Sequence, residues 1–299
     1  MKNCNTLRSF LIKSTSYIFG DGMKQYILKI DCQDEKGLIY RIADAVFKYR
    51  LNIIKNDEYV DHEFNKFFMR AELSGEFKKD ELVGTLEATL PNNANIQLNK
   101  KTKKNIILMA TKESHVLGDI LLKHHSNELN ANILAVISNY ENLKELTSKF
   151  DIPYHFISHD GLTREEHEKK ILDVLAKYSV EFVVLAKYMR ILSSDFIKNY
   201  SEKIINIHHS FLPAFIGANP YKQAYLRGVK IIGATAHFVN DNLDEGPIIS
   251  QDIIRVGHEF TWQDMQRAGR NVEKVVLSNA LDLVLDDRIF VNANKTVIF

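Results

Sequence analysis

Residues 203–209 read KIINIHH, an apolar strand that ends in polar side chains, and this stretch decides the fold of the longer part of the chain. Because side chains alternate between the two faces of a strand, Asn206 and His208 are expected to share one face and His209 to lie on the other. In open α/β sheets, ligands bind beyond the carboxyl ends of the strands. Asn206 and His208 therefore stand where such a fold carries its functional groups.

Strands and helices alternate on both sides of this stretch. Apolar strands are predicted at 105–111, 133–138, 154–157, 181–186, 230–239 and 247–256. The helices predicted between and after them include one that starts at a capping box formed by Thr163 and Glu166, and a long one at 262–285. This alternation predicts an α/β fold with a Rossmann-like, open and mostly parallel sheet that has helices on both faces.

The first hundred residues follow a different pattern. Strands are predicted at 26–32, 52–60, 67–73 and 95–98, and helices at 38–49 and 79–90. The order βαββαβ is that of a ferredoxin-like domain. The expected organisation is a disordered N-terminal extension at 1–22, a small domain at 23–99, a basic linker at 100–104 and a catalytic domain at 105–299. The sequence does not distinguish Met1 from Met23 as the start residue.

The composition excludes several classes of protein. Lys and Arg number 39 and Asp and Glu number 38, so the charge balance argues against a nucleic-acid partner. No apolar run approaches the roughly 20 residues that span a bilayer, which argues against a membrane partner. The two cysteines, Cys4 and Cys32, cannot form a disulfide framework. We therefore expect a cytoplasmic protein that acts on a small molecule.

A second polar stretch follows the strand at 230–239. Residues 240–249 read NDNLDEGPII, an acidic loop that continues through a glycine and a proline, both typical of turns, into an apolar strand. A carboxylate in such a loop is commonly just solvated. Spacing alone does not rank Asp241, Asp244 and Glu245 as partners of the histidines.

In the small domain, residues 31–38 read DCQDEKGL before a helix, and Asn52 opens the next strand. This arrangement resembles the ACT regulatory domain, which binds amino acids. The resemblance implies an amino-acid effector, glycine or methionine, and homo-oligomers built through paired ACT-like domains. The effector site would comprise Asp34, Gly37, Leu38 and Asn52. The alternative is a dimerisation role without ligand, and the chain has Lys36 where the family usually has proline.

Three stretches of the larger domain resemble one family of enzymes. NIHHSFLPAF at 206–215, ATAHFV at 234–239 and LDEGPII at 243–249 are similar to the formyltransferase family that uses 10-formyltetrahydrofolate. The adjacent His208 and His209 resemble its deformylase branch. The resemblance implies a catalytic triad of Asn206, His208 and Asp244. An amide and an imidazolium can stabilise an oxyanion, and Asp244 can hold His208 charged and orient or deprotonate water.

AKYMRILS at 186–193 resembles the loop of this family whose backbone holds the pterin ring of the folate. Apolar side chains suit a flat ring, and backbone groups suit its polar edge. The resemblance implies substrate binding by Met189, Arg190, Ile191, Leu192, His237, Asn240, Asp241 and Leu243. The alternative is that Met189, Ile191 and Leu192 only complete the hydrophobic core.

The implied activity is hydrolysis of 10-formyltetrahydrofolate to formate and tetrahydrofolate, which supplies formate for purine synthesis and balances the one-carbon folate pools. The folate is then the substrate, and neither a cofactor nor a metal is expected. The turn at 111–115 has no glycine for a phosphate cradle, which argues against a ribonucleotide acceptor. The turn resembles a K-E-x-H stretch of the deformylase branch, and this resemblance implies that Lys112 and His115 shape the pocket of the accepting water.

Three other functions stay open at this level. The first is formyl transfer from the same folate to a small amine. The second is a metal hydrolase that uses His208, His209, His237 and Asp244, although adjacent histidines on a strand point apart. The third is a sensor without catalysis, in which the ACT-like domain reports on amino acids through a silenced folate fold.

Overall fold

The computed structural model describes residues 24–214 and 219–299 and divides the chain into two compact units, 1–101 and 102–299. The expected N-terminal extension at 1–22 and the alternative start at Met23 lie outside the described residues. Strand β4 (Asn95–Lys100) ends the first unit and strand β5 (Lys104–Ala110) begins the second. The connection between these two strands is therefore shorter than the linker expected at 100–104.

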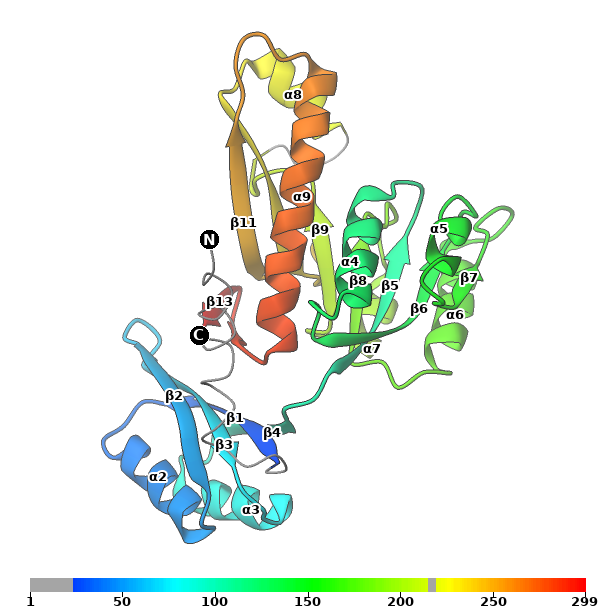
Figure 1. Cartoon of the computed structure of the whole chain (residues 1–299). Helices are drawn as coiled ribbons and strands as arrows, with labels where there is room; N and C mark the ends of the chain where they lie inside the picture. Colours follow the sequence, from blue (N-terminus) through cyan, green and yellow to red (C-terminus); the bar gives the residue numbers. More distant parts are fainter. Residues whose placement is uncertain (1–23, 215–218) are drawn as a thin grey trace, which may run out of the picture. The chain divides into compact units, whose positions relative to one another are not determined.

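The first unit is a four-stranded antiparallel sheet covered by helices. Its elements follow one another as β1 (Gln25–Gln33), α2 (Leu38–Lys48), β2 (Asn52–Asp61), β3 (Lys66–Ser74), α3 (Lys79–Thr89) and β4. The strands pair in the order β2-β3-β1-β4, and both helices lie on one face of the sheet (Figure 1). The predicted ferredoxin-like fold is confirmed.

The core of this unit lies between that face of the sheet and the two helices. Leu28 and Leu73 of the sheet are fully buried there together with Ile42 of α2 and Leu86 of α3. Gly37 precedes α2 with a φ of 86°, a left-handed conformation that glycine adopts without strain. This cap position provides no side-chain hydrogen bond. The backbone N–H groups of the first turn of α2 are therefore open to other partners.

The second unit is built around one large sheet. Its strands are β5, β6 (Ala131–Ser138), β7 (Tyr154–Phe156), β8 (Phe182–Ala186), β9 (Ile204–His208), β10 (Ile231–Phe238) and β11 (Ile248–Arg255). Its helices are α4 (His115–His125), α5 (Lys144–Ser148), α6 (Arg164–Leu175), α7 (Ser194–Asn199), α8 (Pro220–Arg227) and α9 (Trp262–Leu285). A hairpin of β12 (Ile289–Asn292) and β13 (Lys295–Ile298) ends the chain.

The strands of the large sheet pair in the order β11-β10-β9-β8-β5-β6-β7. The pairs from β9 to β7 are parallel, and β10 runs antiparallel to both of its neighbours. The order of the strands reverses at β5, because the chain continues to β6 on one side of it and later to β8 on the other. The predicted Rossmann-like, mostly parallel sheet is confirmed.

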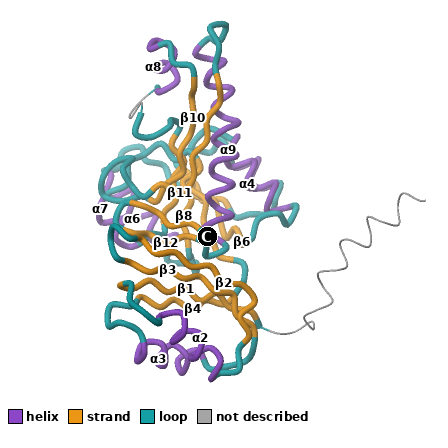
Figure 2. Tube along the Cα trace, turned by 90° about the vertical axis from the view of Figure 1, so that its left-hand side faces the viewer, coloured by secondary structure: helices purple, strands orange, loops and turns teal. Residues whose placement is uncertain are grey.

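Helices cover both faces of this sheet, because successive apolar side chains of β5 point to opposite faces and both must be buried. Ile106 and Leu108 pack under α4 and α9, whereas Ile107 and Met109 pack under α6 and α7. Figure 2 shows these two pairs of helices on opposite sides of the strands. A strand that is buried on both faces is a near-continuous apolar run, which is how β5 and β8 read in the sequence.

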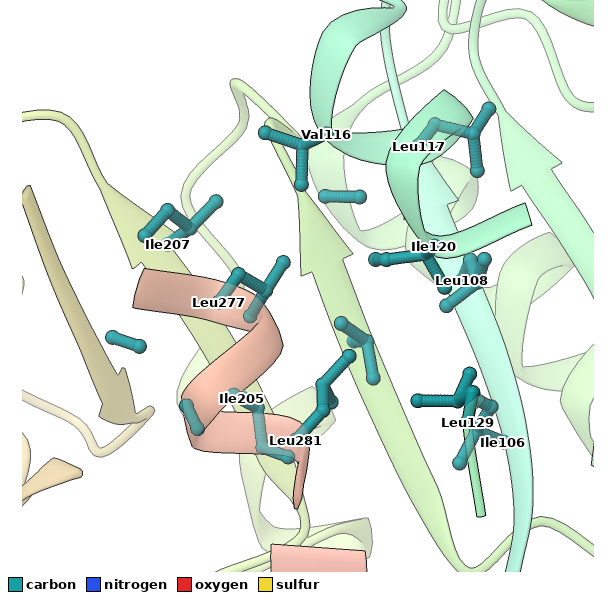
Figure 3. Close-up of a cluster of buried hydrophobic side chains, with 14 of the residues drawn as sticks. Ile106, Leu108, Val116, Leu117, Ile120, Leu129, Ile205, Ile207, Leu277 and Leu281 are labelled. Atoms are coloured by element: carbon teal, nitrogen blue, oxygen red, sulfur yellow. The ribbon is translucent and has the colours of Figure 1, made fainter. Parts of the chain in front are cut away.

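Helix α9 holds β9 by its apolar face. Leu277 and Leu281 of α9 pack against Ile205 and Ile207 of β9 (Figure 3). Alternation then turns Asn206 to the opposite face of the strand. The packing of α9 on one face of β9 thus leaves the other face, with Asn206, to the cavity.

The predicted capping box of α6 is confirmed. The Thr163 hydroxyl accepts a hydrogen bond from the Glu166 N–H at 3.2 Å, and the Glu166 carboxylate accepts one from the Thr163 N–H at 2.9 Å. Thr261 and Asp264 form a second box at the start of α9. Both boxes satisfy backbone donors that would otherwise lack partners at a helix start.

The connection between β10 and β11 depends on a glycine. The Phe238 N–H donates to the Pro247 carbonyl at 2.9 Å, which draws the chain close to β10. A Cβ atom on Gly246 would lie 1.7 Å from the Phe238 carbonyl oxygen. Only glycine permits this approach, so the position of the loop at 240–245 depends on it.

We expect Gly246→Ala to lower the free energy of unfolding of the second unit by about 1–3 kcal/mol or more, because the added methyl group forces backbone apart. The single tryptophan, Trp262 on α9, reports the transition in a denaturant titration. Gly118→Ala on α4 is the control, since its Cβ would meet only Leu146 Cδ2 at 3.9 Å. Unchanged unfolding of Gly246→Ala would contradict the close approach.

Candidate active site

The candidate site is a cavity of about 340 Å³ at the carboxyl ends of β8 and β9. Its walls come from residues 187–192 after β8, from the end of β9 and from the loop at 239–244 after β10. The expected catalytic residues Asn206, His208 and Asp244 line it. All expected substrate-binding residues line it too, namely Met189, Arg190, Ile191, Leu192, His237, Asn240, Asp241 and Leu243.

A buried imidazole and a buried carboxylate form the centre of the cavity wall. Nδ1 of His208 lies 3.2 Å from Oδ1 of Asp244. Burial by itself would raise the pKa of Asp244, but the hydrogen bond from His208 and the nearby histidines outweigh it and lower the pKa below its ordinary value. Asp244 is therefore an anion at neutral pH. Nε2 of His208 is buried and has no hydrogen-bond partner among the described residues.

A second imidazole orients the amide of Asn206. His237 stands opposite Asn206 in the pairing of β10 with β9. Its Nδ1 lies 2.9 Å from the Phe238 carbonyl, which can only accept, so Nδ1 carries the proton. Burial lowers the pKa of His237, so the ring is neutral and Nε2 is an acceptor. The Asn206 Nδ2 group donates to it at 3.2 Å, which leaves the other hydrogen of Nδ2 for a ligand.

The expectation that His209 points away from His208 is wrong. Strand β9 ends at His208, so the alternation of a strand does not extend to the next residue. Both rings line the cavity, with centroids 5.1 Å apart. Burial and the adjacent Lys187 ammonium lower the pKa of His209 to about 4. His209 is thus a neutral imidazole beside the acid–base pair.

Apolar side chains surround the entrance of the cavity. Met189, Ile191 and Leu243 are 61 %, 58 % and 51 % exposed, although each is a large apolar residue. Exposed apolar side chains gathered at one cavity are typical of a binding site for a flat ring. Met189 and Ile191 therefore do not complete the core, as the alternative interpretation required. Leu192, in contrast, is buried in the core under α6 and α7 while it also lines the cavity.

A buried glutamate anchors the loop that carries these residues. Glu168 of α6 accepts hydrogen bonds from the Ser193 N–H at 2.9 Å and from the Ser193 hydroxyl. Ser193 in turn caps α7 by accepting from the Phe196 N–H. The segment at 187–193 is thus held at both ends, by β8 and by this cap.

Lys112 and His115, which were expected at the acceptor pocket, do not line the cavity. The Lys112 ammonium lies 4.2 Å from the centroid of the Tyr140 ring. His115 contacts Glu273 of α9, with 2.8 Å between Nε2 and Oε2. Glu273 was not among the sequence candidates. Its signal in the sequence is a carboxylate on the apolar stripe of α9, three and four residues before Val276 and Leu277.

Lys187 and Asn242 also line the cavity and were not proposed from the sequence. Lys187 follows β8 directly and is 5 % exposed. In the sequence, a lysine directly after a fully apolar strand could have indicated a functional residue. Asn242 lies among candidates of the acidic loop, where single residues cannot be ranked from their spacing.

The first unit has a separate cavity of about 290 Å³ beside the start of α2. Asp34, Gly37 and Leu38 line it together with Glu35, Ile39, Glu58, Tyr59, Val60 and Phe67. Asn52, the fourth expected regulatory residue, opens β2 and is not among its lining residues. The cavity therefore gathers three of the four candidates.

The cavity carries side chains that can act as acids, bases and hydrogen-bond donors. Within residues 24–214 and 219–299, no three His, Cys, Asp or Glu side chains are arranged to hold a metal ion. An imidazole backed by a carboxylate can transfer protons, and an oriented amide can donate to a developing oxyanion. No helix in the described part of the chain is long and apolar enough to cross a membrane.

Comparison with known proteins identifies the relatives of this chain. The Formyl transferase family matches residues 104–281. The formyltetrahydrofolate deformylase of Escherichia coli K12 is 53 % identical over 92 % of this chain and 99 % of its own length. The crystal structure of a formyltetrahydrofolate deformylase from Pseudomonas syringae superposes with a TM-score of 0.92, at 37 % identity over 98 % and 99 % of the two chains. A glycinamide ribonucleotide transformylase from Symbiobacterium toebii reaches a TM-score of 0.64 at 26 % identity over 69 % and 98 %.

The lowered pKa of His209 can be tested in the protein without substrate. In an NMR titration of labelled histidine, its ring should stay neutral at pH 5, because its pKa lies at about 4. Lys187→Met should raise this pKa, though not to the ordinary value of about 6.5, since burial remains the larger cause. As the pH falls from 6.5 toward 4, His209 becomes protonated in the unfolded chain but stays neutral in the folded protein. This difference lowers the free energy of unfolding over that pH range.

Lys198→Met, at an exposed lysine of α7 that pairs with Asp195, is the matched control and should leave the His209 titration unchanged. A midpoint near 6.5 in the wild-type protein would contradict the assignment.

Proposed function

Because the chain belongs to the formyltetrahydrofolate deformylase family and hydrolyses 10-formyltetrahydrofolate to formate and tetrahydrofolate, we propose that Asn206, His208 and Asp244 are its catalytic residues. One observation carries this proposal. Nε2 of His208 is buried and has no hydrogen-bond partner within residues 24–214 and 219–299, while Nδ1 contacts the Asp244 carboxylate. A buried ring nitrogen without a partner is costly unless a ligand completes it.

In the first step, a water oxygen forms a bond to the formyl carbon and its proton passes to the Asp244 carboxylate. The electron pair of the carbonyl moves to the formyl oxygen. Asn206 Nδ2 and the imidazolium of His208 donate to the resulting oxyanion. The hydrogen bond to neutral His237 supports this role of Asn206, because it orients the amide before the substrate arrives.

In the second step, the intermediate collapses and the bond between the formyl carbon and N10 breaks. His208 gives its proton to N10, since a protonated amine leaves far more readily. The proton held by Asp244 returns to His208 across the 3.2 Å contact. Formate, a proton and tetrahydrofolate leave, so atoms and charge balance.

The folate would bind with its pterin ring against the apolar residues at 189–192 and the loop at 240–243. The exposure of Met189, Ile191 and Leu243 at the cavity entrance supports this assignment. In this proposal the folate is the substrate, and side chains and water carry every step without a cofactor. Water is the acceptor, and formyl transfer to a small amine is the alternative.

We also propose the role of this activity in the cell. Hydrolysis returns tetrahydrofolate to the one-carbon pool and releases formate, which purine synthesis can use. A cytoplasmic location fits a chain with two cysteines and a balanced charge, and no nucleic-acid or membrane partner is required.

We further propose that the first unit is an ACT-like regulatory domain that binds glycine or methionine and pairs in a homo-oligomer. Its cavity supports the effector site. The uncapped start of α2 beside Gly37 can receive an α-carboxylate, and Asp34, Glu35 and Glu58 can receive an α-amino group. The exposed Tyr40 and Phe47 of α2 support pairing with a second copy.

The catalytic assignment predicts the behaviour of two variants. His208→Ala and Asp244→Asn should each lower kcat by about 10²-fold or more, because each removes a group that transfers a proton. Tetrahydrofolate binding should change little. The measurement is joint release of formate and tetrahydrofolate from 10-formyltetrahydrofolate without added amine.

His155→Ala, on the edge strand β7, is the control for loss of a partly buried histidine. A His208→Ala or Asp244→Asn variant with the wild-type rate would remove that residue from the mechanism. Formate that appears only after an amine is added would favour the transfer reaction.

The effector site is tested by calorimetry with glycine and with methionine. One of them should bind to the full chain, and Asp34→Ala should weaken binding by about tenfold, the effect of losing one charge-assisted hydrogen bond of about 1.4 kcal/mol. Glu87→Gln, an exposed carboxylate of α3, is the control. No binding of either amino acid would leave the structural dimerisation role.

A further inference from the structure

Polar side chains of this protein meet near the place where an open α/β sheet commonly binds its ligand. The strand order reverses between β5 and β8, and ligands of such folds bind beyond the carboxyl ends of strands at this point. Here Thr111 follows β5 and donates its hydroxyl to the carbonyl of Lys187, which follows β8, at 2.8 Å. Glu273 of α9 reaches the same place.

Glu273 is the centre of a buried polar cluster, which we call the Glu273 cluster and which comprises Glu273, His115, Lys187 and Tyr221. The Glu273 side chain is 1 % exposed. Its Oε2 lies 2.8 Å from Nε2 of His115 and 3.4 Å from Nζ of Lys187. Its Oε1 accepts a hydrogen bond from the Tyr221 hydroxyl at 2.6 Å. The cluster therefore joins α4, α8 and α9 to the end of β8.

The carboxylate of Glu273 stays charged in this setting. Burial alone would raise its pKa, but the hydrogen bond from His115, the Lys187 ammonium and the Tyr221 hydroxyl outweigh burial and lower the pKa to about 2. Outside the cluster, Glu113 contacts Nδ1 of His115 and Nε of Arg270, each at 3.3 Å. The buried Lys187 thus has a permanent counter-charge at every working pH.

Two residues connect this cluster to the catalytic cavity. Lys187 and His209 line the cavity, and neither has a part in the proposed catalytic steps. The backbone of Lys187 has a φ of 62°, so its side chain leaves the end of β8 in a direction that a strand would not give it. The His209 ring lies between the His208 ring, at 5.1 Å, and the Tyr221 ring, at 6.1 Å.

We propose that Glu273 is a positioning residue for the hydrolysis, because it holds Lys187 at the cavity wall and thereby creates, with His209, the place where the attacking water is held. The Lys187 ammonium donates a hydrogen bond to the water oxygen, and a ring nitrogen of His209 accepts one from the water. This inference rests on the proposed roles of His208 and Asp244. The proton that the water loses still passes to Asp244.

The arrangement explains why a lysine stands next to a histidine on this wall. A positive charge beside the water stabilises the negative charge that develops on its oxygen as the proton leaves. Burial and, to a smaller extent, the same charge lower the pKa of the neighbouring His209, so that its neutral ring can accept a hydrogen bond. The charged and titratable groups around His209 are Lys187, Glu273, His208, Asp244 and Tyr221.

The test is Glu273→Gln, which keeps the shape of the side chain and removes its charge. The Lys187 ammonium then lies buried without its counter-charge and is no longer held in place at the cavity wall. We expect kcat at neutral pH to fall by about 10- to 100-fold, as displacement of a catalytic group by about 1 Å does, with KM changed less.

Asp287→Asn is the matched control, because Asp287 forms a buried pair with Lys104 at 3.0 Å outside the cavity. It should lower stability without changing kcat or KM. Lys187→Met should reduce kcat at least as much as Glu273→Gln. The double variant should be no slower than Lys187→Met alone, since Glu273 acts through Lys187.

A folded Glu273→Gln variant with wild-type kcat overturns the inference, and so does a drop in melting temperature without a fall in kcat. Fully additive losses in the double variant overturn it as well, because Glu273 would then act independently of Lys187. His208→Ala in the same assay separates the two proposals. If His208→Ala is active, the catalytic assignment fails, whatever the Glu273 variants do.

Discussion

The contact between the Asp244 carboxylate and the His208 imidazole is the interaction on which the rest of the catalytic cavity depends. It joins the loop after β10 to the end of β9 across 3.2 Å. One nitrogen of the ring contacts the anion, and the other is buried and has no hydrogen-bond partner in the described part of the chain. Asp244 reaches this position only because the loop turns back at Gly246, where no side chain would fit.

Two carboxylates, Asp244 and Glu273, provide the negative charge near the cavity, and each contacts a different set of basic side chains. Asp244 faces His208, and Glu273 faces Lys187 and His115 on the other side of the cavity wall. A buried charge is costly without a partner, so each carboxylate is matched by groups that stabilise its charged form. Between them His209 and His237 stay neutral, because burial lowers their pKa. The site thus holds fixed charges and neutral imidazoles side by side.

Each of the two units buries a hydrophobic core between a sheet and helices, but the two sheets differ in type. In the first unit, helices cover one face of an antiparallel sheet, and the open start of α2 leaves a small cavity beside Gly37. In the second unit, helices cover both faces of a mostly parallel sheet, so function is confined to the ends of its strands. The cavity with the proposed catalytic residues lies at the carboxyl ends of β8 and β9.

The sequence by itself determined both fold classes, because strand and helix periodicity are local signals, and the resemblance of the motifs at 186–193, 206–215 and 243–249 implied 11 of the 19 residues that line the cavity. Only the tertiary structure decided how His209 points, since β9 ends one residue before it. Only the tertiary structure joined Glu273 to His115 and Lys187, which lie far apart in the chain. A buried ion cluster arises from packing between distant elements, and no local pattern encodes it.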